Sequence, residues 1–582
     1  SSGNSNSVRV TVQDNGTAGV DGDLTGGLKL TTFATATLTN NDANAQAGLG
    51  AVNAAGTALT IAAGTQGFAE TSTINLGSAS LSVTGSGAVD LGSAVTAASV
   101  LGSSALGAIT LGLTGLDTVG AVTTGLGNDV LSISSAVRNS SGAYTLVTGA
   151  GTDTLTLSIA QDFSWNAGAD YDTLKVVGDL DVSAKSISLT SVDEIALDTT
   201  TLGAKTFTIS AATFNTNPVF NLRGTAASSD LLLVQGSSSA DTINASSVAV
   251  EVNTATLKIV GGAGNDIITG SSGPDIIDGG LGNDQLSGGS YGDTYIFNTG
   301  DVDAGETIVE STTGIGTDTV WVVTTTDFRN MTTSSFDEIE AITLASNQTA
   351  KFTGLQLTGE SIVLTGDVGV EAVEVYVEAG EQFVSGLTNP AANINTISYF
   401  GTTGAETITG GAMSEIIKGG AGNDLLAGGL GADTYMFDAA ASNGIDRITF
   451  GVVDGSAIDD TLNFTADTFL GVHTEQIGHI TESTVTSALT TNQAGDNILI
   501  LKYAYFADAA ALVAATTMFA ASFNADGKVL IIYAESATTD ARIAVATITD
   551  AGDVTAATDV AVLVGLTVAE AYSGFSASNF TF

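Results

Sequence analysis

The sequence predicts an all-β fold in which short strands and glycine-rich turns stack as coils of a β-solenoid. Short segments of alternating apolar and polar residues recur along the chain, and alternation at period two is typical of strands. The 582 residues include 71 glycines but only three prolines, which is unlike collagen or a proline-rich linker. A nine-residue pattern rich in glycine and acid recurs in two blocks, and units this short bury a core only by stacking.

The composition excludes several classes of function. The 61 acidic and 15 basic residues give a net charge of −46, which opposes unaided binding to nucleic acid or to an anionic lipid surface. The absence of cysteine excludes disulfides, thiolate metal sites and thiol catalysis. No apolar run reaches the roughly 18 to 20 residues of a transmembrane segment. The many acids also supply hard oxygen ligands for divalent cations.

Residues 1–120 form a β-rich module dominated by Ser, Thr, Ala and Gly. Segments such as 79–83 and 108–114 alternate at period two and predict strands, and the intervening Gly, Ser, Asn and Asp predict turns. A β-sandwich and the irregular coils of a β-solenoid both account for this pattern.

Residues 121–235 form a second β module with weaker glycine–acid turns that lead into strands. The turns of this kind lie at 125–129, 149–153, 168–172 and 314–318. A second phrase, Ser-x-Asp-Glu-Ile, recurs at 191–195 and 335–339. The chain therefore consists of related β modules, and the turns ending at Asp129, Asp153 and Asp318 suggest that cation binding extends beyond the two regular blocks.

The nine-residue pattern has a fixed chemistry at each position. Glycine dominates the first, second and fourth positions, where we expect tight turns with positive φ. The sixth position is acidic in every copy, and the eighth is apolar or aromatic and is expected to face a thin core. The copies begin at Gly261, Gly270, Gly279, Gly288, Gly401, Gly410, Gly419 and Gly428, and their acids are Asp266, Asp275, Asp284, Asp293, Glu406, Glu415, Asp424 and Asp433.

The spacing of these acids predicts calcium sites. Two units complete one coil, so residues eighteen apart stack at about 4.8 Å. The resulting pairs are Asp266 with Asp284, Asp275 with Asp293, Glu406 with Asp424, and Glu415 with Asp433. Stacked carboxylates repel one another unless a cation lies between them, and calcium accepts six to eight oxygens, whereas magnesium prefers a tighter, hydrated octahedron. A metal-free turn array is the alternative, but it does not require an acid at the same position in every copy.

These nonapeptides closely resemble the RTX (repeats-in-toxin, haemolysin-type) calcium-binding family, whose unit is Gly-Gly-x-Gly-x-Asp-x-apolar-x. The resemblance implies a parallel β-roll with Ca2+ between adjacent turns, bound by the acids and by backbone carbonyls of the other positions. It implies one site from Gly262, Gly264, Asp266, Gly279, Leu281 and Asp284, and a second from Ser271, Gly273, Asp275, Gly288, Ser290 and Asp293. In the second block the implied ligands are Gly404, Glu406, Glu415, Gly419, Ala421, Asp424, Gly428, Leu430 and Asp433.

The second block departs from the family pattern. Glu406 and Glu415 replace aspartate, Met413 and two threonines loosen the turns, and Lys418 places a positive charge nearby. We therefore expect the glutamate-containing sites to bind calcium weakly or not at all.

The predicted organisation has six parts, and the last resembles the tail of RTX proteins. Its apolar end, Ser-Asn-Phe-Thr-Phe, resembles an uncleaved type I secretion signal, and 508–523 predicts a short helix followed by strands at 529–533 and 541–548. The parts are β modules at 1–120, 121–235 and 301–400, calcium blocks at 236–300 and 401–440, and a β-rich C-terminal domain with one or two short helices at 441–582.

No catalytic constellation stands out in the sequence. His473 and His479 lie six residues apart, whereas the His-Glu-x-x-His motif of zinc proteases places its ligands four apart on a helix. Residues 288–292 match Gly-x-Ser-x-Gly, but they lie inside a repeat rather than between a strand and a helix. Carboxylates for glycoside chemistry are plentiful, and nothing singles out a pair. We expect no enzymatic activity.

The leading hypothesis is a calcium-dependent structural protein on the surface of a bacterial cell. The β modules, acidity, lack of cysteine and type I-like tail resemble Gram-negative surface-layer proteins with RTX repeats. That resemblance implies secretion, self-assembly into a homo-oligomeric lattice, and cell-surface polysaccharide as an anchoring partner. An RTX adhesin or biofilm-matrix protein is the alternative, and a secreted hydrolase is a third possibility.

Overall fold

The computed structural model resolves two compact units. The first comprises Ser1–Tyr295 and Glu310–Gly316, and the second Ile296–Val309 and Thr317–Phe582. No helix in the described part of the chain has the length and apolar character needed to cross a membrane. The structure describes residues 7–12, 28–29, 35–40, 47–49, 52–53, 58–64, 68–71, 74–76, 79–91, 95–97, 99–113, 121–134, 144–197, 203–225, 230–251, 254–310, 315–438, 444–450, 460–464, 477–480, 498–514, 527–536, 540–548, 554–567, 575 and 579–581.

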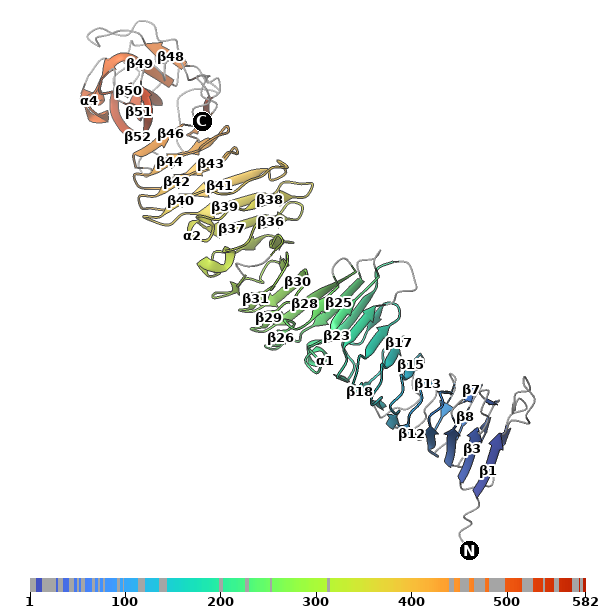
Figure 1. Ribbon diagram of the computed structural model, residues 1–582. Coiled ribbons are helices and arrows are strands. Elements are labelled where there is room, and N and C mark those ends of the chain that lie inside the picture. The colour runs from blue at the N-terminus through green and yellow to red at the C-terminus, as the bar shows by residue number, and fades with distance from the viewer. Residues whose placement is uncertain are drawn as a thin grey trace. The chain divides into compact units, whose positions relative to one another are not determined.

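The first unit is a parallel β-solenoid in which successive coils add one strand to each sheet (Figure 1). One sheet runs β1 (Ser7–Val12), β3 (Thr35–Asn40), β6 (Ala58–Ala63), β9 (Leu81–Gly85), β12 (Val100–Ala105), β14 (Ala121–Thr123), β16 (Tyr144–Val147), β18 (Phe163–Asn166) and β21 (Ile187–Thr190). A second runs β4 (Ala47–Leu49), β7 (Phe68–Thr71), β10 (Val89–Asp90), β13 (Ile109–Gly112), β15 (Val130–Ile133), β17 (Thr154–Leu157), β19 (Thr173–Val176), β22 (Glu194–Leu197), β24 (Asn221–Arg223) and β27 (Ala249–Val250). A third, short sheet contains β2 (Leu28–Lys29), β5 (Val52–Asn53), β8 (Ile74–Asn75) and β11 (Val95–Thr96).

The first calcium block continues this unit. One sheet contains β20 (Leu180–Asp181), β23 (Thr206–Ser210) and β25 (Asp230–Gln235), followed by β28 (Ala255–Ala263) and β30 (Asp275–Leu281) of the block. Another contains β26 (Thr242–Asn244), β29 (Ile267–Thr269) and β31 (Gln285–Ser287), all three within the block. A short helix, α1 (Ala211–Phe214), interrupts the strands, and β32 (Thr294–Phe297) lies at the boundary between the units.

The second unit contains the second calcium block and the C-terminal sheet. Its strands include β33 (Thr307–Ile308), β34 (Thr319–Val322), β36 (Ala341–Leu344) and β38 (Val363–Gly366), and the sheet β35 (Thr326–Asp327), β37 (Thr349–Thr353), β39 (Ala372–Tyr376), β41 (Thr396–Phe400), β43 (Ile416–Lys418), β45 (Thr434–Met436), β47 (Thr461–Asn463) and β53 (Phe580–Thr581). A further sheet runs β40 (Gln382–Val384), β42 (Thr407–Thr409), β44 (Leu425–Ala427), β46 (Asp446–Thr449), β52 (Val554–Thr567), β51 (Asp540–Ile548), β50 (Gly527–Ala534), β49 (Ile498–Tyr505) and β48 (Ile477–Ile480). The helices described here are η1 (Thr333–Phe336), α2 (Gly354–Leu357) and α4 (Ala509–Ala514).

Period-two alternation produces the core of the coils. In β6, Leu59 and Ile61 are buried while Thr60 between them is half-buried. Leu59 pairs with Leu81 of the next coil in parallel register, so apolar side chains stack on one another along the axis. This pairing decides between the two architectures that the first 120 residues allowed: the strands described there belong to a solenoid and not to a β-sandwich.

The register confirms that two nonapeptides complete one coil. Ile268 of β29 pairs with Leu286 of β31, and Ile408 of β42 pairs with Leu426 of β44, each a shift of eighteen residues. The eighth-position side chains fill the interior, where none is more than 1 % exposed: Ile268, Ile277, Leu286, Tyr295, Ile408, Ile417, Leu426 and Tyr435. The all-β parallel solenoid predicted from the sequence is therefore confirmed.

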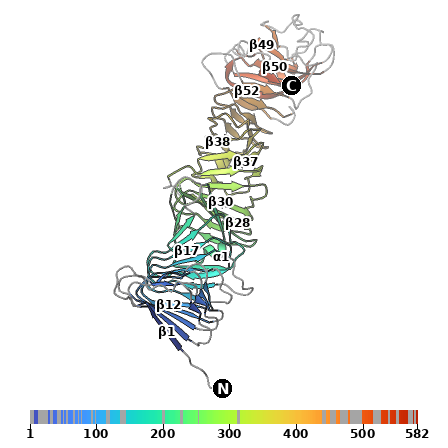
Figure 2. The same ribbon diagram turned by 90° about the vertical axis from the view of Figure 1, so that its right-hand side faces the viewer.

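The C-terminal sheet changes from parallel to antiparallel pairing. Strand β51 pairs antiparallel with both β50 and β52, and the three strands belong to one sheet (Figure 2). The strands predicted at 529–533 and 541–548 lie in β50 and β51. The predicted helix at 508–523 is confirmed over α4, and its part at 515–523 lies outside the described residues.

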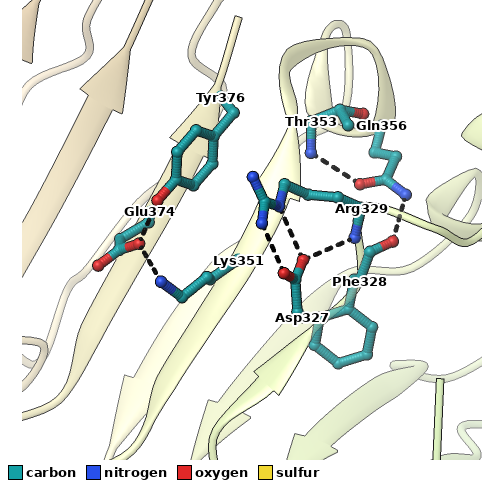
Figure 3. A network of polar contacts seen from close by, with 8 residues as sticks. All are labelled: Asp327, Phe328, Arg329, Lys351, Thr353, Gln356, Glu374 and Tyr376. Carbon is teal, nitrogen blue, oxygen red and sulfur yellow. Dashed lines mark hydrogen bonds and ion pairs between the residues drawn. The ribbon is translucent and has the colours of Figure 1, made fainter.

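Charges alternate across one face of the second unit (Figure 3). Asp327, Lys351 and Glu374 are register partners on β35, β37 and β39, and Lys351 Nζ lies 2.8 Å from Glu374 Oε2. Arg329 binds Asp327 through two hydrogen bonds of 2.8 and 2.6 Å, and its guanidinium lies 4.3 Å from the centre of the Tyr376 ring. Opposite charges on neighbouring strands stabilise the sheet modestly. The turns of the calcium blocks lack such basic partners and stack acid on acid.

Candidate metal centre

The turns of both calcium blocks bring the predicted acid pairs together. In each pair the backbone N–H of one acid donates to a carboxylate oxygen of the acid one coil further on. The four hydrogen bonds are Asp266 to Asp284 (2.8 Å), Asp275 to Asp293 (2.7 Å), Glu406 to Asp424 (2.9 Å) and Glu415 to Asp433 (2.9 Å). One oxygen of each accepting carboxylate therefore fixes the register between coils.

The remaining oxygens give these turns their capacity for a cation. All eight acids are at most 2 % exposed. The second carboxylate oxygens of Asp266, Glu406, Glu415 and Asp424 are buried and have no hydrogen-bond donor facing them. A buried carboxylate oxygen without a donor is strongly destabilising unless a cation compensates it. Hard carboxylate and carbonyl oxygens are the ligands that calcium prefers, so the residues present fit Ca2+.

The first glycine of each repeat makes room for this oxygen. A Cβ added at Gly261 would lie 2.5 Å from the Gly279 carbonyl oxygen and closer still to Asp266 Oδ2. Both oxygens therefore face the same small space, which only a glycine leaves open. The expectation of positive φ is confirmed for most glycines at the second and fourth positions, for example Gly262 (107°) and Gly264 (117°). It is wrong for Gly273, Gly404 and Gly411 at those positions, and for the first-position Gly261. At Gly261 the collision with oxygen atoms, and not the backbone angle, requires glycine.

The same convergence recurs in the other repeats. The would-be Cβ of Gly270 meets Gly288 O and, at 2.6 Å, Asp275 Oδ2. In the second block the corresponding pairs are Gly419 O with Glu406 Oε2 at Gly401, and Gly428 O with Glu415 Oε2 at Gly410. The implied carbonyls of Gly279, Gly288, Gly419 and Gly428 thus converge with the predicted acids.

Other implied ligands lie in the turns but take part in hydrogen bonds between coils. The Leu281 carbonyl accepts from Gly264 N (2.8 Å), and a carbonyl retains a second lone pair for a metal. The N–H groups of Ala421 and Leu430 donate to Thr402 O (2.8 Å) and Gly411 O (2.9 Å). Gly262 is in register with Gly280, Gly404 O faces Gly422, and Ser290 is exposed in the turn before β32. The detailed ligand set stays a prediction.

Ser271 makes one turn of the first block different. It occupies the second position, where the other copies in that block have glycine, and its backbone N–H donates to Asp275 Oδ2 while its hydroxyl donates to Asp275 Oδ1 (2.9 Å). Gly273 lacks positive φ and packs against Val250. Ser271 therefore donates to both oxygens of Asp275, whereas Asp266 has a donor at Oδ1 and none at Oδ2.

Burial makes the metal-free carboxylates hard to ionise. Desolvation raises the pKa of Asp275 to about 7, against hydrogen bonds from Ser271 that lower it. Burial and then the neighbouring Asp433 raise the pKa of Glu415 to about 9, and burial and then Asp424 raise the pKa of Glu406. Lys418 pairs with Asp438 (2.7 Å), so its charge is compensated outside the acid pairs.

The recurring Ser-x-Asp-Glu-Ile phrase has a structural role that the sequence did not reveal. In the first unit Asp172 N donates to Asp193 (2.9 Å), and in the second Asp318 N donates to Glu340 (2.7 Å). The acid that receives the last backbone N–H of the glycine–acid turn therefore lies within the first phrase, as Asp193, and directly after the second, as Glu340. The signal was that each phrase follows a glycine–acid turn at a similar distance: Ser191 lies 19 residues after Asp172, and Ser335 lies 17 residues after Asp318.

Comparison with known proteins matches the regions that carry this geometry. The family model of the RTX calcium-binding nonapeptide repeat matches four copies, over residues 260–294 and 400–435. No curated protein matches the chain. RTX repeats bind calcium and are typical of secreted proteins. The chain therefore carries RTX-type calcium-binding nonapeptide repeats in two blocks of a parallel β-solenoid.

Proposed function

We propose that this protein is a calcium-dependent structural subunit of a bacterial surface layer, secreted by a type I system and without enzymatic activity. The observation that carries the proposal is the set of buried, donor-free carboxylate oxygens stacked between coils. These groups serve no substrate, because they lie inside the turn stacks. They make the fold itself depend on a cation.

Calcium acts first on folding. Without the ion, burial of acids such as Asp266 and Asp424 opposes closure of the coils, since each carboxylate loses its hydration. With the ion bound, the free energy of binding becomes free energy of folding. Extracellular calcium modules bind at about 10⁻⁴–10⁻³ M, which suits a chain that folds only after export.

A repetitive, acidic, cysteine-free chain suits assembly at a cell surface. The net charge of −46 keeps isolated subunits apart, and divalent cations reduce that repulsion when subunits meet. The described coils provide long parallel sheets rather than a cleft lined by catalytic groups. Cell-surface polysaccharide is the proposed anchoring partner.

Electron microscopy of cell surfaces tests the proposal. We expect a two-dimensional periodic array in millimolar calcium, its loss in a chelator, and its recovery when calcium returns. The paired substitutions Asp266→Asn and Asp284→Asn should weaken the array. The control Glu251→Gln with Glu378→Gln removes the same charge from exposed side chains and should leave it intact. Calcium-dependent attachment to surfaces without any array would favour the adhesin hypothesis instead.

A further inference from the structure

A stack of acidic turns in the first unit lies outside both regions that match the RTX repeat. We call residues 124–129, 148–153 and 167–172 the N-terminal acid stack. Its backbone repeats the nonapeptide geometry: Gly149 and Gly151 have φ of 99° and 117°, close to the 107° and 117° of Gly262 and Gly264. The third turn has Gly168 at 109° and Asp170 at 81°. A non-glycine residue at positive φ is unusual and shows how strongly the stack imposes this turn.

Hydrogen bonds between these turns follow the calcium blocks. The N–H of Asp129 donates to Asp153 Oδ1 (2.7 Å), and the N–H of Asp153 donates to Asp172 Oδ1 (2.8 Å). The N–H of Ala169 donates to the Gly149 carbonyl (2.8 Å), as the N–H of Ala421 does to Thr402 in the second block. The acids therefore stack coil upon coil as Asp266 and Asp284 do.

Two buried oxygens of the stack lack a donor. Asp153 and Asp172 are 0 % exposed, and the Oδ2 atom of each has no hydrogen-bond partner. Asp129 differs, because Ile109 N and Gly125 N donate to its two oxygens. Within the N-terminal acid stack, the buried carboxylate oxygens without a hydrogen-bond donor therefore belong to the turns 148–153 and 167–172.

Threonine replaces the first glycine here and changes the surroundings of the acids. The Thr148 hydroxyl donates to Ala167 O (2.7 Å) and accepts from the indole N–H of Trp165 (3.2 Å). A hydroxyl has one hydrogen, so Thr148 has none left for Asp153 Oδ2. Its oxygen is a further hard ligand beside the acids. Trp165 is 1 % exposed and places an indole against this turn.

We propose that Asp153 and Asp172 bind a divalent cation of the calcium class between these turns, at a site separate from the two nonapeptide blocks. The donor set is hard oxygen throughout, which favours calcium over transition metals. The site does not depend on the surface-layer proposal, since it concerns only the fold of the first unit. It extends cation-dependent folding to coils that the RTX repeat does not cover.

Terbium luminescence tests this site in the full-length protein, with terbium(III) as the calcium probe. The chain has two tryptophans, so Trp321→Phe leaves Trp165 as the sole indole donor. We expect luminescence sensitised by Trp165, displaced by calcium, and lost when Asp153→Asn and Asp172→Asn are added. The matched control, Asp266→Asn with Asp284→Asn, should retain it because energy transfer falls steeply with distance. Loss in the control alone, or signal unaffected by the Asp153 and Asp172 substitutions, would overturn the proposal.

Equilibrium dialysis of calcium gives an independent count. The Asp153→Asn, Asp172→Asn protein should bind about one calcium ion fewer per chain than the parent. Asparagine keeps the Oδ1 acceptor that fixes the coil register, so Trp165 emission should still report a buried indole in calcium-free buffer. The single Asp172→Asn change tests the same count if the double variant folds poorly. An unchanged calcium count in a folded variant would also overturn the proposal.

Discussion

At the scale of single residues, the two carboxylate oxygens of Asp266 have different roles. Its Oδ1 accepts from Asp241 N (2.7 Å) and holds one coil on the next, while its Oδ2 is buried with no donor. The first task needs only an acceptor, which asparagine also provides. The second needs a negative charge, which asparagine lacks.

Asp266→Asn should therefore have effects of opposite sign with and without calcium. In a chelator it removes a buried charge and should raise the unfolding temperature. In millimolar calcium it should weaken binding at that site by at least about tenfold, or about 1.4 kcal/mol. Thermal unfolding followed by circular dichroism in both buffers measures the two effects. Destabilisation of equal size in both buffers would contradict separate roles for the two oxygens of Asp266.

Gly261→Ala tests the space beside the carboxylate. Its Cβ would displace Asp266 Oδ2 and Gly279 O, so we expect loss of calcium affinity and destabilisation of more than about 2 kcal/mol in calcium. The control is Gly178→Ala, where φ is 79° and nothing lies within 4 Å. It should cost about 1 kcal/mol through backbone strain alone, equally with and without calcium. Equal calcium dependence of the two variants would count against the role assigned to Gly261.

The sequence predicted the acids and their pairing but not how the first glycine works. The eighteen-residue repeat fixes which coils are neighbours, and this places Asp266 over Asp284. The rotamer of each carboxylate depends on packing against the next coil, which no local pattern encodes. For the same reason Ser271, which satisfies Asp275, was indistinguishable from any other second-position residue.

At the scale of elements, the turn and its following strand form the repeating unit. Glu406 and Glu415 extend their carboxyl groups further than aspartate does, and a Cβ at Gly401 or Gly410 would lie 2.9 or 3.1 Å from Oε2. The longer side chains reach the neighbouring Asp424 and Asp433, which contributes to the raised pKa of both glutamates. Calcium binding there must first separate these coupled acids.

Glu406→Asp with Glu415→Asp should strengthen the second block. Shortening both side chains restores the geometry of the aspartate repeats and removes two rotatable bonds that calcium must fix. We expect calcium affinity of that block to rise by about three- to tenfold, or about 1 kcal/mol. Isothermal titration compares this variant with the parent, whose other sites are identical, and an unchanged or lower affinity would show that glutamate does not weaken calcium binding in the second block.

Period-two alternation and turn composition predicted most strands, because each coil buries one apolar row. Alternation alone left a sandwich and a solenoid open over the first 120 residues, since both bury one face of a strand. The short helices α1 and α2 were missed because each has only four residues, too few for a helical period. Their caps are local: Ser210 accepts from Thr213 N, and Gln356 accepts from Thr353 N.

At the scale of the whole molecule, the protein accumulates negative charge that its own basic residues do not balance. Burial raises the pKa of Asp153 and Asp275 to about 7 and of Asp172 to about 6. In the unfolded chain these groups titrate near 3.8. The calcium-free folded state therefore binds more protons than the unfolded state between about pH 4 and pH 7.

The calcium-free protein should consequently lose stability as the pH rises from 4 to 7, because its buried acids must then ionise. Calcium reverses this trend, since the ion binds the ionised carboxylates and protons compete with it below pH 7. Urea unfolding at pH 5 and pH 8, in chelator and in calcium, measures all four cases. A calcium-free protein that is more stable at pH 8 than at pH 5 would contradict the assignment of buried, uncompensated acids.

The central claim, that calcium binding and folding of the solenoid are one process, is tested most directly by calcium titration of the full-length chain followed by far-ultraviolet circular dichroism and urea unfolding. We predict reduced β-structure with a low unfolding midpoint in chelator, and a cooperative gain of both at millimolar calcium that the same concentration of magnesium does not produce. At a hundred times the dissociation constant each site should add about 2.7 kcal/mol to the free energy of unfolding. The same spectrum and the same unfolding midpoint in chelator and in calcium would contradict the account.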